Sequence, residues 1–395
     1  MLDIPQLLAQ ELSLKSFQIN AALELLAEGA TVPFIARYRK ERTGEMDEVQ
    51  LRQLADRHTY LTDLEERKGT ILKAIAEQGK LTDELKTKIE ASVQKTELED
   101  LYLPYRRKRR TRASAAREKG LEPLAEFIQK LNREGSAIAS LEPEAAQYIS
   151  EEKGIATVDD ALQGASDILA EGVAEQAKLR AYLRQYFLQE GMFASQVKSD
   201  YPEGSTKFEM YRNYQIKVRE IAPHNLLALL RGENEGVLKL ELTFDQDAVL
   251  LYLEAEAVRT KSPVVRDFYR AMLKDAFLRL MKPSLTTEVI GEKKTWADEE
   301  SIKTFEANLK HLLLSSPAGM KPTLGVDPGF RTGCKVAAIS ETGQFQEYQA
   351  IFPHQAEAQR QKAANILKQL IQKYGIGLIA IGNGTASRET DTFVG

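Results

Sequence analysis

The sequence predicts a mainly α-helical protein with three parts: a multi-helical N-terminal body containing helix-turn-helix elements, a small α+β segment, and a partial α/β domain. Three observations predict this. Apolar residues recur at helical spacing over most of residues 1–195, strand-like alternation appears near residue 240, and beyond residue 320 short apolar strands accompany a single helix. The length of 395 residues suits about two or three folding units. We therefore expect domains over residues 1–195, 196–315 and 320–395.

Composition narrows the function classes. The only cysteine is Cys334, and the four histidines are scattered singly, so neither a disulfide framework nor a zinc module can form. No apolar run is long enough to cross a membrane, and the first residues lack the pattern of a signal peptide. We expect a cytoplasmic protein without a membrane partner, a metal or a cofactor.

Residues 13–44 predict two short helices joined by a tight turn. An apolar stripe from Phe17 to Leu25 stops at Gly29, and Thr31 can cap the second helix. This outline occurs in DNA-reading helix-turn-helix motifs, but short helices joined by glycine turns are more often a generic packing unit. The basic residues on and just after the second helix suit phosphates better than base edges: Arg37, Arg39 and Lys40.

A long helix is predicted over residues 47–78 and a shorter one from residue 82, which together form a helical hairpin. Helical spacing returns near residues 121–131, 160–169 and 174–189. Residues 238–244 alternate apolar and polar side chains, as a half-buried strand does. Helices are expected after Pro263 and again after Asp298, and residues 315–319 are expected to form a linker.

Positive charge concentrates in residues 101–120, although the whole chain carries a formal net charge of −4. This stretch holds eight basic residues against one acid, Glu118. Clustered guanidinium groups can fork onto phosphate oxygens and release counterions from a polyanion. The alternative is a solvated loop that offsets the preceding acids Glu97, Glu99 and Asp100. The first interpretation makes six residues candidates for nucleic-acid binding: Arg106, Arg107, Lys108, Arg109, Arg110 and Arg112.

The C-terminal part predicts a particular sheet. Strands are expected over residues 323–327, 334–339, 345–352 and 376–381, with a helix over 356–374 before the last. A three-strand meander, a helix and a strand parallel to the first form the opening of an RNase H-like fold. Nucleases of that fold hold two magnesium ions between several carboxylates.

Asp327 is the weak catalytic candidate of this domain, because it falls at the end of the first strand. The position expected for a second acid carries Gly382-Asn383-Gly384 instead. Asp327 is therefore open to three interpretations: a turn cap, a residual metal or phosphate contact, or a catalytic acid. Residues 325–329 also resemble the phosphate loop of actin-like ATPases. Cys334 is expected to be a buried free thiol, and no base can be assigned to it from sequence.

Three blocks carry a family resemblance: ATVPFIARYRKE at residues 30–41, LEDLYLPY at 98–105, and LGVDPGFRTGCK at 324–335. Together with RGENEG at 231–236 and GNGT at 382–385, they resemble the bacterial Tex transcription accessory proteins over the whole length. The resemblance implies an elongated, mostly helical nucleic-acid-binding protein with a YqgF-type RNase H-like domain. It also implies helix-hairpin-helix modules and a C-terminal OB-fold RNA-binding domain, which this sequence does not contain, so we expect an N-terminal fragment that binds weakly by itself.

Two functions follow from the residues and the resemblance. The favoured one is a transcription accessory protein that binds RNA or DNA through phosphates with little sequence preference, beside the transcription machinery. The alternative is a magnesium-dependent nuclease or resolvase that uses Asp327. The incomplete set of carboxylates favours the binding protein over the enzyme.

Overall fold

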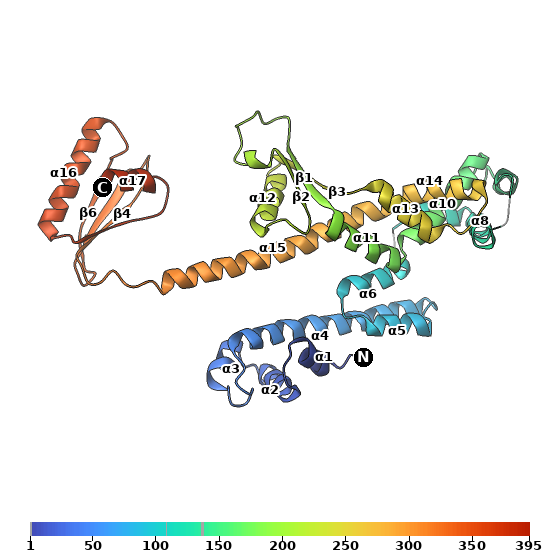
Figure 1. Cartoon of the computed structure of the whole chain (residues 1–395), viewed down its shortest axis with the longest axis horizontal. Helices are drawn as coiled ribbons and strands as arrows, with labels where there is room; N and C mark the ends of the chain where they lie inside the picture. Colours follow the sequence, from blue (N-terminus) through green and yellow to red (C-terminus); the bar gives the residue numbers. More distant parts are fainter. Residues whose placement is uncertain (1, 108, 136–137) are drawn as a thin grey trace. The chain divides into compact units, whose positions relative to one another are not determined.

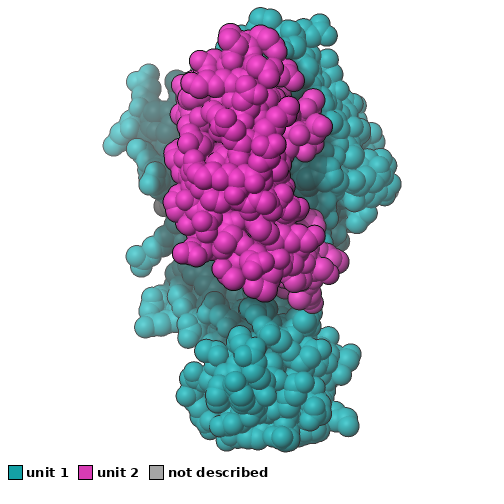
Figure 2. Space-filling model, turned by 90° about the vertical axis from the view of Figure 1, so that its left-hand side faces the viewer, with its two compact units in different colours: residues 1–302 teal, residues 303–395 magenta. Residues whose placement is uncertain are grey.

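The computed structural model describes residues 2–107, 109–135 and 138–395. The chain divides into two compact units, residues 1–302 and residues 303–395, which Figure 2 colours separately. The molecule is mainly helical with two small sheets, as the sequence predicts. The expected domain boundaries at residues 195 and 320 stay predictions.

The N-terminal helices pack around α4, the long blue helix of Figure 1. Apolar residues on α4 face a core shared with α1, α2 and α3, where Leu8, Ile19, Ile35 and Leu54 are fully buried. Asp47 begins α4 with a reciprocal capping box to Gln50. The long helix and the hairpin after it are confirmed. The helices are α1 (Ile4–Glu11), α2 (Ser16–Ala27), α3 (Val32–Tyr38), α4 (Glu48–Glu77), α5 (Asp83–Ala91) and α6 (Lys95–Tyr102).

A second core belongs to the body that follows, and α10 lies at its centre, with contacts to α7, α8 and α14. Thr157 caps α10 through a box with Asp160, and the helix then buries residues on several sides. The elements are η1 (Leu103–Tyr105), α7 (Arg112–Glu118), α8 (Glu122–Glu134), α9 (Glu142–Ala145), η2 (Ala146–Tyr148), α10 (Val158–Ala174) and α11 (Ala177–Glu190).

An antiparallel sheet of order β2-β1-β3 follows α11. The expected strand near residue 240 is confirmed as β3 (Leu238–Thr243), which alternates buried and exposed residues. Its partner β1 (Met192–Val197) and the edge strand β2 (Asn213–Lys217) have weaker patterns and were not predicted. The short η3 (Glu209–Tyr211) precedes β2, and α12 (Pro223–Asn234) packs against β3.

The last helices of this body differ from the expectation. After α13 (Gln246–Ala257), α14 (Pro263–Asp275) runs through a π-helical turn, η4 (Ala276–Met281), directly into α15 (Lys282–Leu313). The new helix start expected after Asp298 is therefore wrong. Asp298 lies within α15 and accepts a hydrogen bond from Lys294 one turn earlier, so it is a surface ion-pair partner and not a cap.

The C-terminal unit contains a four-stranded sheet of order β6-β5-β4-β7. Strands β4 (Thr323–Asp327), β5 (Cys334–Ile339) and β6 (Phe345–Ile351) form an antiparallel meander, and β7 (Leu378–Ile381) pairs parallel to β4. Helix α16 (Glu357–Tyr374) buries Ala363, Leu367 and Leu370 in the core of this unit, and α17 (Ser387–Val394) follows β7. The predicted strand order is confirmed.

Candidate nucleic-acid interface

The basic residues lie in a loop that connects η1 to α7. Arg106, Arg107, Arg109 and Arg110 are exposed, whereas Lys108 lies outside the described residues. The loop ends where Thr111 caps α7 and forms a reciprocal box with Ser114. Both ends of the loop are thus tied to helices, and its arginines point into water.

The acids that precede the loop bind other partners. Glu99 accepts hydrogen bonds from Arg67 at 2.7 and 3.1 Å. Asp100 accepts hydrogen bonds from Arg180 at 2.7 Å and from Arg184 at 2.8 Å. Glu99 and Asp100 therefore do not pair with the basic loop, whereas Glu97, the third acid of that alternative, is exposed.

The loop arginines differ in their own partners. Arg110 forms an exposed ion pair with Glu118 at 3.1 Å. The charge of Arg112 acts on the carboxylates of Asp167 and Asp275, so part of it is already balanced. In the described ranges, Arg106, Arg107 and Arg109 form no ion pair with a carboxylate. Three guanidinium groups are thus available to an external anion.

A surface cavity of about 530 Å³ adjoins the start of this loop. Arg106 and Arg107 line it together with Arg67, Tyr102 and one acid, Glu77. The Arg67 guanidinium lies 5.4 Å from the centre of the Tyr102 ring. Gln78, at the end of α4, donates a hydrogen bond to the carbonyl of Tyr105 and fixes the loop beside the helix. Arg67 was not predicted as part of this site. The sequence signal that could have identified Arg67 is that positions 67, 74 and 78 share one face of the helix.

The second predicted basic group lies elsewhere on the same helix. Arg37, Arg39 and Lys40 are exposed on and just after α3, which contacts α4 and leads into its first turn. The loop around Arg106 contacts the last turn. At the rise of an α-helix, the 30 residues of α4 separate its ends by about 45 Å. The structure therefore places the two basic groups at opposite ends of α4.

Asp327 is the last residue of β4. The Gly382 N–H donates a hydrogen bond to the carbonyl of Val326, and Asn383 is the residue after Gly382 in the sequence. The Asp327 side chain is 72% exposed, and its nearest cation is Lys335, with 3.6 Å between Nζ and Oδ2. Within the described parts of the chain, no group of three or more Asp, Glu, His or Cys residues is arranged to hold a metal ion. Asp327 thus lies at the predicted strand end, beside a lysine.

Cys334 is buried, and the structure supplies neighbours that the sequence could not assign. Its Sγ lies 3.7 Å from His354 Nε2 and 3.6 Å from Thr390 Oγ1. His354 and Thr390 are 2.9 Å apart, so this trio joins β5, the segment after β6, and α17. Cys334 is completely buried as a free thiol, as the sequence predicts.

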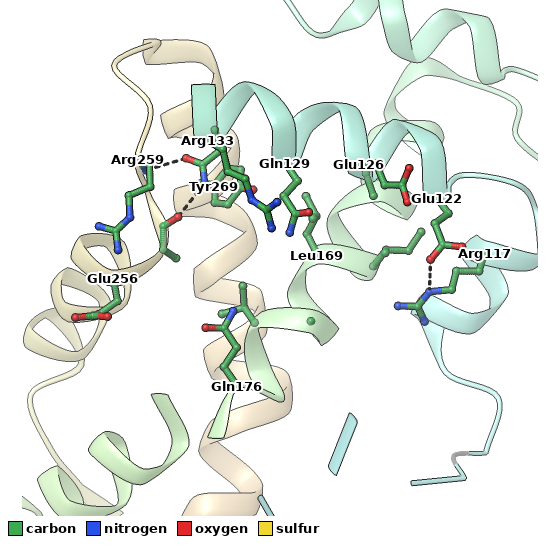
Figure 3. A pocket seen from close by; sticks show the side chains of 16 residues that line it. Arg117, Glu122, Glu126, Gln129, Arg133, Leu169, Gln176, Glu256, Arg259 and Tyr269 are labelled. Atoms are coloured by element: carbon green, nitrogen blue, oxygen red, sulfur yellow. Dashed lines mark hydrogen bonds and ion pairs between the residues drawn. The ribbon is translucent and has the colours of Figure 1, made fainter. Parts of the chain in front are cut away.

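Figure 3 shows a further cavity, of about 500 Å³, between α8, α10 and the segment that precedes α14. Arg117, Arg133 and Arg259 line it, but so do three glutamates. Arg117 pairs with Glu122 at 3.3 Å inside this cavity and with Glu171 at 2.9 Å. Because acids accompany the arginines, this cavity does not select an anion. The glutamates are Glu122, Glu126 and Glu256.

Among the helices that the structure describes, none combines the length and the apolar composition that crossing a bilayer requires.

Three sequence families match the chain in order. The Tex-like protein N-terminal domain matches residues 2–76, the Tex central region-like family residues 139–305, and the Tex protein YqgF-like domain residues 321–395. Relatives match it from end to end. The transcriptional accessory protein Tex of Neisseria gonorrhoeae is 43% identical over 399 residues, covering 100% of this chain and 51% of its own length.

Two further relatives extend the comparison. Protein YhgF of Escherichia coli K12 is 42% identical, covering 98% of this chain and 50% of its own length. The human S1 RNA-binding domain-containing protein 1 is 28% identical, covering 99% of this chain and 40% of its own length. The chain thus spans about half the length of these bacterial relatives. The order of the matched domains, the sheet topology and the end-to-end similarity together show that the chain belongs to the Tex family.

Proposed function

We propose that this chain is part of a transcription accessory protein that binds RNA or DNA through phosphate contacts with little sequence preference. The proposal rests on one observation: Arg106, Arg107 and Arg109 are exposed and form no ion pair among the residues that the structure describes, while Glu99 and Asp100 bind other arginines. The names of two relatives, a transcriptional accessory protein and an S1 RNA-binding domain-containing protein, support a nucleic acid as the partner. It would act in the cytoplasm beside the transcription machinery.

Phosphate contacts suit the position of these arginines. Each guanidinium is a planar donor that can bind two phosphate oxygens at once. The arginines lie on a loop and not on a helix shaped to enter a groove, and phosphates carry no sequence information. Arg110 and Arg112 would add further contacts beside these three arginines, as would Lys108, which lies outside the described residues. Arg37, Arg39 and Lys40 would form a second contact at the other end of α4.

A salt series on the 395-residue chain tests this function. Fluorescence anisotropy would measure the affinity for labelled RNA and DNA while four exposed arginines are changed to glutamine. Because each phosphate contact contributes about one unit to the slope of log affinity against log salt, we expect a slope shallower by about two to four units. The variant is R106Q/R107Q/R109Q/R110Q.

A matched control removes the same charge from exposed side chains that are already paired with glutamates: R52Q/K88Q/R219Q/R270Q. This control should keep the wild-type slope. An equal loss in both variants would mean that overall charge, and not the loop, governs binding. An unchanged slope in the loop variant would show that these arginines do not bind phosphates of the nucleic acid.

A further inference from the structure

Two aromatic side chains project from α3 into water. Phe34 is 39% exposed and Tyr38 is 58% exposed, although their neighbour Ile35 is completely buried. The two residues are four positions apart and therefore share one face of the helix, with ring centres 5.4 Å apart and planes inclined at 47°. Two exposed rings on one turn form an apolar patch, and the cations beside it distinguish this patch from other exposed aromatic residues such as Phe345 and Tyr348.

The face is held in place from behind. Gln18 of α2 donates hydrogen bonds to the carbonyls of Thr43 and Gly44, and the buried Thr43 hydroxyl lies 3.2 Å from the carbonyl of Lys40. Gly44 has φ +61°, and a Cβ on it would come within 2.8 Å of the Phe17 ring. The loop after α3 is therefore packed on α2 through these contacts.

Cations surround the two rings. The Arg39 guanidinium lies 5.1 Å from the centre of the Phe34 ring and donates a hydrogen bond to the carbonyl of Tyr38. Over the described part of the chain, Arg37, Arg39 and Lys40 form no ion pair with a carboxylate. Arg42 differs, because it pairs with Glu24 at 2.9 Å and lies 4.0 Å from Glu28.

We propose that Phe34 and Tyr38 form a stacking platform for unpaired bases of single-stranded nucleic acid, with Arg37, Arg39 and Lys40 binding the adjacent phosphates. This inference rests on the proposed function and names its substrate class. Alternating base and phosphate chemistry matches a surface of exposed rings bordered by unpaired cations. In a duplex the bases already stack on each other, so they offer no free face on which the two rings could stack. An apolar protein partner would bury the rings but leave three cations without counter-charges.

The test compares strands with duplexes. The double variant F34L/Y38L keeps apolar bulk and removes both rings. Anisotropy would measure its affinity for a polyuridine strand and a polythymidine strand of about 20 nucleotides, and for a duplex of equal length. We expect at least about a tenfold loss of affinity for both strands, no change for the duplex, and an unchanged salt slope, since no charge is removed.

A matched control makes the same changes at two exposed aromatics of β6. Phe345 is 62% exposed and Tyr348 is 51% exposed, so F345L/Y348L alters similar surface in the other unit. It should bind strands and duplex as the wild type does. Thermal melting followed by circular dichroism would verify that both double variants fold.

A second measurement needs no variant. A strand carrying 5-iodouracil should crosslink the wild-type chain within residues 32–42. Crosslinks confined to other regions would overturn the stacking platform, as would equal losses of affinity for strand and duplex in F34L/Y38L. Binding of a protein partner to this face, without binding of a strand, would also overturn the platform and assign the face to that partner. Binding by the wild type separates the failure of the two proposals. If the wild type bound no nucleic acid at any salt, the proposed function itself would fail.

Discussion

Asp100 shows how a single side chain joins two parts of the first unit. It lies on α6 and accepts hydrogen bonds from Arg180 and Arg184 of α11, which also bind Glu288 of α15. The side chains of Asp100, Arg180 and Arg184 are 6%, 5% and 9% exposed. Burial alone would lower the pKa of Arg184, but the hydrogen bonds that it donates to Glu288 and Asp100 outweigh burial and raise that pKa. Arg184 therefore stays charged and depends on these two acids.

Removing Asp100 should be costly for this reason. In D100A, two buried guanidiniums share the single carboxylate of Glu288, and we expect the free energy of unfolding to fall by about 3–5 kcal/mol. Urea denaturation followed by circular dichroism measures it. The control E48A breaks the exposed pair with Arg52 and should cost less than about 1 kcal/mol. A D100A protein as stable as E48A would show that the cluster adds no stability.

The same residue shows what sequence could and could not predict at the site. The basic loop is predictable because its charges are contiguous and exposed, a property of the chain itself. The partners of Asp100 are 80 and 84 residues away, so sequence placed its charge beside the loop and could not show that α11 binds it. Phe34 and Tyr38 were equally hidden, because an apolar residue on a short helix is normally assigned to the core.

At the scale of elements, predictions succeeded where one helix or strand buries a regular face. Helix α4 and strand β3 show strong periods of this kind. Strand β2 was missed because it buries none of its residues completely and so lacks the alternation of buried and exposed residues that marks β3. The join of α14 to α15 was missed because Asp298 resembles a helix start in sequence. In the structure a π turn, Ala276–Met281, carries the helix from α14 into α15 without a break, and Asp298 lies inside α15.

Two helical glycines give opposite predictions for alanine. Gly232 is buried in α12, where a Cβ would lie 2.5 and 2.7 Å from Leu238 of β3. Gly69 in α4 has open space around it. G69A should stabilise the chain by about 0.5–1 kcal/mol through helix propensity, whereas G232A should destabilise it by about 1–3 kcal/mol because the helix must move off the sheet. Denaturation of both variants by urea decides this, and a stabilised G232A would show that α12 does not pack closely on β3.

At the scale of the whole molecule, the chain contains separate cores. The buried residues of the first unit form two clusters, and those of the second form their own cluster around β4 and α16. Residues 315–319 lie after the end of α15 and before β4, and they are exposed. A unit with its own core can unfold without its neighbour.

We therefore expect the two units to unfold in separate transitions that respond to different variants. Hydrogen exchange measured by mass spectrometry across a urea series would assign each transition to peptides. D100A should shift peptides within residues 1–302 alone, whereas E347Q should shift only those within residues 321–395. Glu347 accepts hydrogen bonds from Lys373 and Tyr374, both at 2.7 Å, and these lower its pKa from 4.5 to about 2.

A lowered carboxyl pKa sets the direction of the pH dependence. The folded second unit holds Glu347 ionised at pH values where the unfolded chain already binds a proton, so its contribution is complete above about pH 4.5 and is lost as the pH falls towards 2. The difference in the free energy of unfolding of the second unit between wild type and E347Q should therefore be small but measurable at pH 7. It should shrink as the pH falls from about 4.5 towards 2. A single transition in which D100A and E347Q move all peptides together would contradict separate units, because it would require one cooperative core.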